Sequence, residues 1–353
     1  MKEHYGIGIM SGTSHDGLDL ACCRFSEDGE GRWSYAILRA TTIPYTAEWR
    51  ERLLALPGAG EEAITRADRD LGIWMGEAAR HFMEASQISP GFIASHGHTI
   101  FHDPAAGLTL QIGKGEEIAR LCGLPVIFDF RSADVAMGGQ GAPLVPLGDK
   151  LLFADYGYCL NLGGIANISC DLDGKRIAFD VCPANMMLNH LAEKTGMPYD
   201  KGGKTAAMGN LLPGLLEKLE SLPFYKLKGP RSLGREYASK HIFPMLDNCR
   251  AAIPDLLRTC TEHIALRVAA VADNKNKGRM LVTGGGAWNE FLMERIRQKS
   301  GPEVVVPEAT VTDYKEAMIF ALLGLLRLQN RVNILGSVTG SGKDHSSGRI
   351  VIS

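Results

Sequence analysis

Two stretches of this chain repeat one pattern: strand, small-residue turn, strand, turn, strand. In the first, residues 5–10, 18–25 and 33–40 are rich in apolar residues and are separated by turns rich in Gly, Asp and Ser. The second begins at Tyr158 with CLNLGGIANISCDL and continues with KRIAFD after the turn at 173–174. Short connections of this kind favour antiparallel pairing. The pattern predicts two similar three-stranded meanders; internal duplication and chance likeness of two hairpins are both open explanations.

Helical and strand patterns alternate around these meanders, which indicates an α/β protein. Helices are predicted at 46–56, 63–85, 115–122, 184–194, 205–219, 255–273, 289–298 and 315–328, and further strands at 92–95, 109–112, 126–130 and 279–282. A loop rich in Gly and Pro at 137–146 is a candidate crossover between domains. A chain of 353 residues is long enough for two domains.

Charge and cysteine content argue against several classes of protein. A net charge of −2 gives no basic field for nucleic acid. The eight cysteines form no CxxC pair, which favours reduced thiols over a disulfide framework or a zinc site. The N-terminal residues lack the apolar core of a signal peptide, and the apolar run at 317–328 is too short to span a bilayer. We therefore expect a cytoplasmic protein without nucleic-acid or membrane partners.

Three glycine-rich turns follow apolar strands, at 10–13, 162–166 and 283–287. Glycine allows close approach of the backbone to a ligand, and free N–H groups in such a turn bind phosphate. Three turns of this kind suggest a nucleotide held between two domains, although purely structural turns would also explain them. A sequence near the C-terminus, SVTGSGKD, lacks the first glycine of a Walker A motif and is interpreted as a loop.

Polar residues at the ends of predicted elements are further candidates for chemistry. Asp180 ends a strand and precedes a helix that a proline initiates, so its carboxylate is placed to face a cleft or to act only as a helix N-terminal acid. Arg131 is suited to hold a substrate carboxylate or to form an ordinary salt bridge. The SHGHT segment, 95–99, lacks further metal ligands, which favours substrate contact or loop packing over zinc.

These segments, in this order, resemble the 1,6-anhydro-N-acetylmuramic acid kinases of the actin/hexokinase/Hsp70-like ATPase superfamily. The resemblance spans nearly the whole chain and rests on GIMSGTSHDGLDLA, SHGHTIFHDP, GGQGAPLVP, LNLGGIANIS, FDVCPANMML, SLGREY and VTGGGAWNEFLM. It implies a two-domain actin-like ATPase (ribonuclease H-like) fold, in which each domain has a mixed five-stranded sheet flanked by helices and the active site lies in the interdomain cleft. We expect domain I to comprise 1–134 plus 312–353, and domain II 135–311.

The resemblance also implies the site residues. The ATP-binding residues would be Gly12, Thr13, Ser14, His15, Asp16, Gly17, Leu18 and Asp19 in the first turn, Asn161, Gly163, Gly164 and Asn167 in the second, and Gly284, Gly285, Gly286 and Asn289 in the adenosine motif. The catalytic residue would be Asp180. The substrate-binding residues would be His96, Thr99, Arg131, Asn185 and Glu316.

The implied reaction couples hydrolysis to phosphoryl transfer. Asp180 would act as general base on a water that opens the 1,6-anhydro bridge, and the released O6 would accept the γ-phosphoryl group of ATP. The products would be N-acetylmuramic acid 6-phosphate and ADP, in peptidoglycan recycling. Magnesium would neutralise charge on the transferring group, although the sequence does not identify its ligands. The resemblance further suggests a homodimer.

Three departures from the family pattern lie on the catalytic side. The common DTGPGN segment is DVCPAN at 180–185, the common Gln of HGQT is His98, and a later helical Asp is Asn189. Two alternatives therefore stay open: a kinase for a different sugar, and an ATP-binding regulatory protein without turnover. The ATP-binding motifs show no comparable change.

Overall fold

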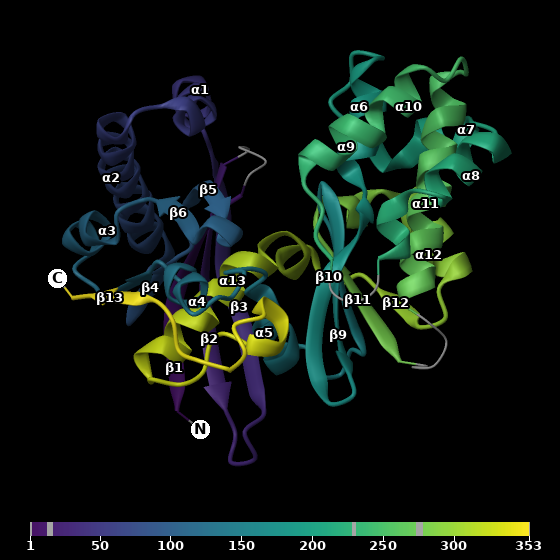
Figure 1. Ribbon diagram of the computed structural model, residues 1–353. Helices are drawn as coiled ribbons and strands as arrows, with labels where there is room; N and C mark the ends of the chain where they lie inside the picture. Colours follow the sequence, from purple (N-terminus) through teal and green to yellow (C-terminus); the bar gives the residue numbers. More distant parts are fainter. Residues whose placement is uncertain (1, 13–16, 228–230, 273–277, 353) are drawn as a thin grey trace. The chain divides into compact units, whose positions relative to one another are not determined.

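The computed structural model describes residues 2–12, 17–227, 231–272 and 278–352 (Figure 1). The chain forms two compact units, which we call unit 1 (Met1–Ala154 with Tyr314–Ser353) and unit 2 (Asp155–Asp313). The domains expected from the sequence change at residues 135 and 312, whereas the compact units change at 155 and 314. The Gly- and Pro-rich loop at 137–146 thus lies inside unit 1, and the chain passes into unit 2 after Ala154.

Unit 1 is built on a mixed six-stranded sheet with the order β13-β7-β4-β1-β2-β3. Its strands are β1 (Glu3–Ser11), β2 (Gly17–Glu27), β3 (Trp33–Pro44), β4 (Phe92–Ser95), β7 (Val126–Phe128) and β13 (Arg349–Val351). The expected five strands are corrected to six here, because the C-terminal β13 pairs antiparallel with β7 at the edge. A separate two-stranded sheet contains β5 (His98–Asp103) and β6 (Leu108–Ile112).

The residues of β1 face two helical layers in alternation. Ile7 and Ile9 are fully buried in a core shared with the helix α2 (Glu61–Ser86), whose Leu71 and Met75 are also fully buried. Gly8 lies between them and faces the other way, since a Cβ there would lie 1.7 Å from the carbonyl oxygen of Ala317 in the helix α13 (Ala309–Leu328). Successive residues of a strand point to opposite faces. Glycine on one face of β1 therefore lets α13 pack directly on the backbone of the strand.

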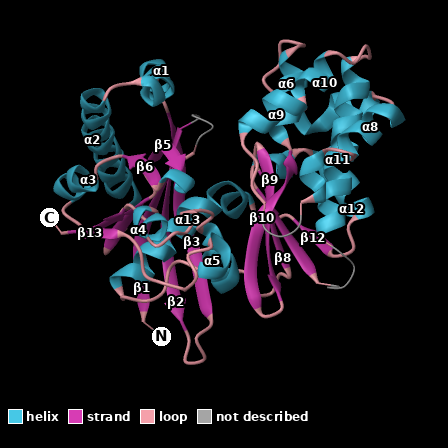
Figure 2. Ribbon diagram, in the orientation of Figure 1, coloured by secondary structure: helices cyan, strands magenta, loops and turns pink. Residues whose placement is uncertain are grey.

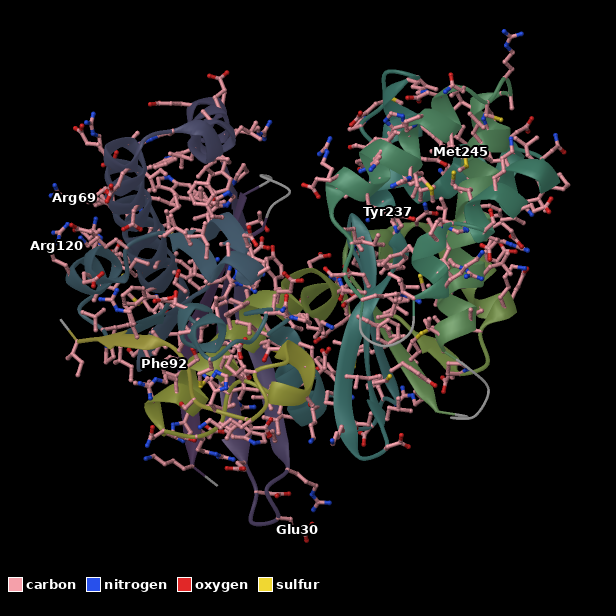
Figure 3. All side chains as sticks on the ribbon, in the orientation of Figure 1. Glu30, Arg69, Phe92, Arg120, Tyr237 and Met245 are labelled. Carbon is pink, nitrogen blue, oxygen red and sulfur yellow. The ribbon has the colours of Figure 1, made fainter. Side chains whose placement is uncertain are left out.

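Phe92 is the reason for a second glycine in the same strand. It lies on β4, in parallel register with Gly6 of β1 (Figure 3). A Cβ on Gly6 would lie 2.2 Å from the Phe92 ring.

The helices of unit 1 are α1 (Ala47–Ala55), α2 (Glu61–Ser86), α3 (Gly115–Cys122), α4 (Ser132–Ala136), α5 (Val145–Leu152) and α14 (Gly336–Thr339), together with α13 (Ala309–Leu328) from Tyr314 onward.

Unit 2 is built on a mixed five-stranded sheet with the order β10-β9-β8-β11-β12. Its strands are β8 (Tyr158–Leu162), β9 (Ile165–Leu172), β10 (Lys175–Pro183), β11 (Arg279–Thr283) and β12 (Glu303–Val305). The first three strands form an antiparallel meander, and β11 and β12 extend the sheet in parallel from β8. The strands β3-β2-β1-β4-β7 of unit 1 have the same order and directions. The repeated pattern in the sequence is therefore a repeated topology, and the prediction of two mixed sheets is confirmed.

Helices flank this second sheet (Figure 2). They are α6 (Asn185–Glu193), α7 (Lys204–Met208), α8 (Pro213–Glu220), α9 (Arg235–His241), α10 (Phe243–Asp247), α11 (Ile253–Val271) and α12 (Glu290–Lys299). The single helix expected at 205–219 is wrong: Pro213 has no N–H and starts α8, after a break at Gly209. A Cβ on Gly209 would lie 2.0 Å from the carbonyl oxygen of Pro254, so the break brings α7 close to α11.

Short 3₁₀ turns complete the connections, at Leu56–Gly58, Pro104–Ala106, Lys201–Gly203, Pro223–Lys226 and Gly285–Trp288. Within the described ranges, the structure contains no helix with both the length and the apolar character needed to cross a membrane.

Candidate functional site

The end of β1 is held by a buried chain of hydrogen bonds. Ser11 Oγ lies 2.6 Å from the hydroxyl of Tyr45 and 2.7 Å from Nδ1 of His98. Burial raises the pKa of Tyr45 to about 12, so this hydroxyl stays protonated at neutral pH. This chain of hydrogen bonds fixes Ser11, the last residue of β1, at the first glycine-rich turn. It also gives His98 a structural partner, which the sequence did not reveal.

The first predicted ATP-binding segment is only partly described. Thr13, Ser14, His15 and Asp16 lie outside the described residues. On its far side, Leu18 is fully buried in the core, and Asp19 Oδ1 accepts a 2.6 Å hydrogen bond from the Thr42 hydroxyl. Leu18 and Asp19 are paired with β1 on one side and β3 on the other, so the Asp19 carboxylate is the group of 17–19 that a ligand could contact.

His96 and Arg131, both predicted to bind substrate, are neighbours in unit 1. Arg131 Nη2 lies 2.8 Å from Nε2 of His96, and Arg131 Nη1 donates a 2.6 Å hydrogen bond to the Gly141 carbonyl. His96 Nδ1 lies 2.8 Å from the carbonyl oxygen of Gly97. A carbonyl only accepts, so Nδ1 carries the proton and Nε2 accepts from the guanidinium. Burial and the adjacent cation lower the pKa of His96, which keeps the ring neutral.

Glu316 and Thr99 are the other two predicted substrate-binding residues of unit 1. Burial raises the pKa of Glu316, and its charge in turn favours the protonated form of Arg131. Burial lowers the pKa of Arg131 to about 10, so the guanidinium remains charged at neutral pH. Thr99 lies on β5, a strand that was not predicted, and its hydroxyl accepts a 3.4 Å hydrogen bond from Gln111. Arg131, His96 and Glu316 thus form an electrostatically coupled group, with Thr99 on a nearby strand of the same unit.

Sequence reasoning missed a buried ion pair next to Glu316. Lys315 Nζ of α13 lies 3.1 Å from Asp149 Oδ1 of α5, and each side chain is only 4% exposed. A signal was present, because Lys315 and Glu316 come directly before the apolar run at 317–326. No signal pointed to its partner, because Asp149 lies in α5, a helix that the sequence pattern did not predict. The pair ties α5 to the start of the Glu316-bearing segment.

In unit 2, the second glycine-rich turn is held by backbone hydrogen bonds. The N–H groups of Ala184 and Met186 donate to the Gly164 carbonyl at 2.8 and 3.1 Å, and the Asn185 N–H donates to Gly163 at 3.1 Å. These bonds engage the carbonyl groups of the turn rather than its N–H groups. The Asn185 side chain also donates to the Leu162 carbonyl at 3.0 Å. Asn185, predicted to bind substrate, therefore first of all joins α6 to the end of β8.

The third glycine-rich turn packs on the same end of β8. Gly284 has φ of +86°, and a Cβ there would lie 2.4 Å from Asn161 Oδ1. A Cβ on Gly286 would lie 2.7 Å from Leu162 Cβ. Asn289 caps α12, since its Oδ1 accepts a 3.0 Å hydrogen bond from the Leu292 N–H. The turns that contain Asn161–Asn167 and Gly284–Asn289 thus meet, as two parts of one ligand site in unit 2 require.

A β-bulge sets the direction of the Asp180 side chain. Asp180 pairs with Asn167 and Cys182 with Ala166, so Val181 is the extra residue of β10. Bulges next to active sites re-aim a side chain. Burial raises the pKa of Asp180, while hydrogen bonds from the Leu233 N–H, 2.7 Å from Oδ2, and from the Ser232 hydroxyl, at 3.4 Å, oppose that rise. Asp180 is therefore a half-buried carboxylate with a raised pKa, the state expected of a general base.

The departures from the family pattern around Asp180 fill the core. Val181, Cys182 and Ala184 are each fully buried among the residues of α6 and α11. Burial raises the pKa of the Cys182 thiol, so it stays neutral. These side chains act by packing, and the carboxylate at the bulge is retained.

A groove of about 430 Å³ lies between α2 and the β5–β6 sheet. It is lined by five apolar residues, one threonine and two acids, namely Glu61, Ile64, Thr65, Asp68, Phe101, Leu108, Leu110 and Ile112. No predicted site residue lines it. The described part of the chain also contains no group of three His, Cys, Asp or Glu side chains that could hold a metal ion.

Comparison with known proteins identifies the relatives of this chain. The family model described as anhydro-N-acetylmuramic acid kinase matches residues 4–353. The anhydro-N-acetylmuramic acid kinase of Pseudomonas putida is 37% identical, covering 95% of this chain and 96% of that protein. The enzyme of the same name from Nitrosomonas europaea is 35% identical over 98% of this chain and 99% of that protein.

Among solved structures, the (R)-2-hydroxyglutaryl-CoA dehydratase component A of Acidaminococcus fermentans aligns with a TM-score of 0.47 and 13% identity, covering 90% of this chain and 96% of that chain. The full-length match, and not this distant likeness, decides the assignment. The chain belongs to the anhydro-N-acetylmuramic acid kinase family.

Proposed function

We propose that this protein phosphorylates 1,6-anhydro-N-acetylmuramic acid with ATP and opens the anhydro bridge with water. The observation that carries the proposal is the full-length family match combined with a raised-pKa carboxylate, Asp180, at the bulge of β10. The products are N-acetylmuramic acid 6-phosphate and ADP, which places the enzyme in cell-wall recycling.

The chemistry assigns Asp180 the role of general base. Its carboxylate takes a proton from water while the water oxygen bonds to the anomeric carbon, and the bond from that carbon to O6 breaks. The electron pair of that bond passes to O6, which attacks the γ-phosphorus of ATP and releases ADP. General-base catalysis of this kind contributes about 10²–10⁴-fold.

Sugar recognition is assigned to His96, Thr99, Arg131 and Glu316 in unit 1 and to Asn185 in unit 2. The muramic acid substrate carries a lactyl carboxylate, and Arg131 is a part-buried cation suited to pair with a planar anion. The neutral His96 supports this role because it accepts from Arg131 without competing for negative charge. Glu316 completes the group as a hydrogen-bond partner for sugar hydroxyls.

ATP binding is assigned to the three glycine-rich turns. Glycines at 284 and 286 allow the contact between the second and third turns, and the backbone N–H groups of these turns are the phosphate donors. Residues 12–19 contribute the first turn, with Asp19 at its end. ATP enters as its magnesium complex, a substrate, and we assign no protein ligand to that ion. We further propose a cytoplasmic homodimer.

A coupled ADP-release assay tests the function. The enzyme should release ADP with 1,6-anhydro-N-acetylmuramic acid and should be inactive with glucose, N-acetylglucosamine and N-acetylmannosamine. Activity on ordinary hexoses alone would show a different sugar kinase, and ATP binding without turnover on any sugar would show a regulatory protein.

A further inference from the structure

A short segment, residues 231–233, runs beside the edge strand β10 at Asp180. The Asp180 N–H donates to the Arg231 carbonyl at 2.9 Å, and Arg231 Nε donates back to the Asp180 carbonyl at 3.2 Å. The Leu233 N–H donates to Asp180 Oδ2 at 2.7 Å. Both the backbone and the carboxylate of Asp180 are thus held by residues about 50 positions later in the chain.

The two carboxylate oxygens of Asp180 are not equivalent. Oδ2 accepts from the Leu233 N–H and, at 3.4 Å, from the Ser232 hydroxyl. Across the described ranges, no hydrogen bond to Oδ1 is found. A carboxylate that accepts hydrogen bonds through one oxygen is fixed in orientation, and its other oxygen stays available for proton transfer.

Arg231 is itself anchored by aromatic rings. Its guanidinium carbon lies 4.9 Å from the ring centre of Phe224 and 5.6 Å from that of Phe179. Its Nη1 also donates to the Leu227 carbonyl at 3.3 Å. Stacking on two rings restricts a planar guanidinium in a way that a lysine would not reproduce.

The aromatic platform is in turn joined to two helices. Tyr237 of α9, labelled in Figure 3, accepts a 3.4 Å hydrogen bond from the Phe224 N–H. The neighbouring Tyr225 hydroxyl lies 2.8 Å from Nε2 of the fully buried His263 in α11. The segment that holds Asp180 therefore rests on the core of unit 2.

We propose that three residues are positioning groups for Asp180: Arg231 holds its backbone, and the Ser232 hydroxyl and the Leu233 N–H hold its carboxylate through Oδ2, which leaves Oδ1 to accept the proton from water. The inference rests on the proposed role of Asp180 as general base and adds residues that touch Asp180 rather than the sugar.

The positioning groups also set the pH range of the base. Burial raises the pKa of Asp180, whereas the Leu233 and Ser232 donors and the Arg231 charge lower it. The buried Cys182, the nearby titratable group of β10, stays neutral because burial raises its own pKa. Removal of a positioning group should therefore move the acid limb of the activity profile to higher pH.

The test compares pH profiles of kcat/KM for Arg231→Met, Arg231→Lys and Ser232→Ala. Arg231→Met should lower kcat about 10-fold and move the acid limb up by about one pH unit, with KM for ATP unchanged. Arg231→Lys keeps the charge, so its acid limb should lie close to that of the wild type. Its kcat should recover only in part. Ser232→Ala should show a smaller upward shift, since its contact is long. The matched control is Ser221→Ala, because the Ser221 hydroxyl donates only to the Lys218 carbonyl.

Two outcomes would overturn the inference. If Asp180→Asn keeps wild-type turnover, the base itself is wrong and the inference falls with it. If Asp180→Asn is inactive but Arg231→Met and Ser232→Ala keep the wild-type acid limb and kcat, only the positioning role fails. Should Arg231→Met not fold, as judged by ATP binding in calorimetry, the acid limb of Ser232→Ala decides between these results.

Discussion

The two units share a strand order but hold their candidate site residues by different means. In unit 2, the glycine-rich turns are tied by backbone hydrogen bonds and by direct packing on Leu162. In unit 1, the corresponding region depends on buried polar side chains: Ser11 with Tyr45 and His98, Arg131 with His96, and Lys315 with Asp149. One topology thus supports two kinds of candidate site, one shaped by the main chain and one by buried and part-buried polar side chains.

That contrast has consequences for substitution. A site shaped by backbone should be sensitive to added volume, whereas a site shaped by buried charges should be sensitive to the loss of one partner. In the proposed mechanism Asp180 belongs to neither class, because its own carboxylate would be the reacting group. The substitutions below separate these three cases.

Asp180→Asn should have the largest effect, a loss of turnover of about 10²–10⁴-fold with ATP binding retained. Stability should not fall. Since the pKa of Asp180 is raised in the folded state, its ionised form disfavours folding above that pKa, and the penalty disappears as pH falls through it. Steady-state kinetics checks the loss of turnover, and the melting temperature at pH 7.5 checks the stability. Near-normal turnover would remove Asp180 from the mechanism.

Lys315→Met should lower the free energy of unfolding by about 3–5 kcal/mol, because it removes the cation that lies beside the buried Asp149 carboxylate. The double variant Lys315→Met/Asp149→Leu should recover most of that loss. Urea denaturation measures both. The exposed pair Arg66–Glu62 is the control, for which Arg66→Met should cost less than about 1 kcal/mol. Equal stability of the single and double variants would contradict a buried ion pair that depends on both partners.

Arg131→Met should reduce kcat/KM for the sugar about 10²-fold with little change in KM for ATP, since it removes the cation and frees His96 and the Gly141 carbonyl. Arg69→Met is the matched control. Arg69 is an exposed arginine of α2 that pairs with Glu117 at the surface, and it is labelled in Figure 3 beside Arg120. If Arg131→Met impaired the kinetics with the sugar and with ATP equally, Arg131 would act only in folding.

Gly286→Ala should have the smallest effect, a loss of about 1–3 kcal/mol of stability with a raised KM for ATP. The added Cβ would lie 2.7 Å from Leu162 Cβ and 2.9 Å from its carbonyl oxygen. Gly214→Ala in α8 is the control, since nothing lies within 4 Å of its Cβ position. If thermal unfolding of the two variants coincides, the close contact between the third turn and β8 does not matter for stability.

Local patterns predicted much of this fold. The two meanders, the helices near 63–85 and 255–273, and the buried strand at 92–95 depend on short-range periodicity, and the structure confirms them. The strand β5 was missed because its residues, beginning HTIFH, lack a clear alternation of apolar and polar side chains. The break at Gly209 and Pro213 was missed because an apolar pattern continues through it.

The site was predictable as a set of residue types but not as a set of contacts. Asp180 was found from its place at a strand end, yet its contacts with Arg231 and Leu233 join residues about 50 positions apart. The bulge at Val181 and the burial of Cys182 depend on sheet register and tertiary packing, which a single sequence does not encode locally. Lys315 and Asp149 are 166 positions apart and were missed for the same reason.

The central claim is that one enzyme adds both water and a phosphoryl group to an anhydro sugar. Mass spectrometry of the product formed from 1,6-anhydro-N-acetylmuramic acid and ATP tests it most directly. The account predicts a single product with the mass of the substrate plus one water and one phosphoryl group, and no such product with Asp180→Asn. A product heavier by the phosphoryl group alone, with the anhydro bridge intact, would contradict it.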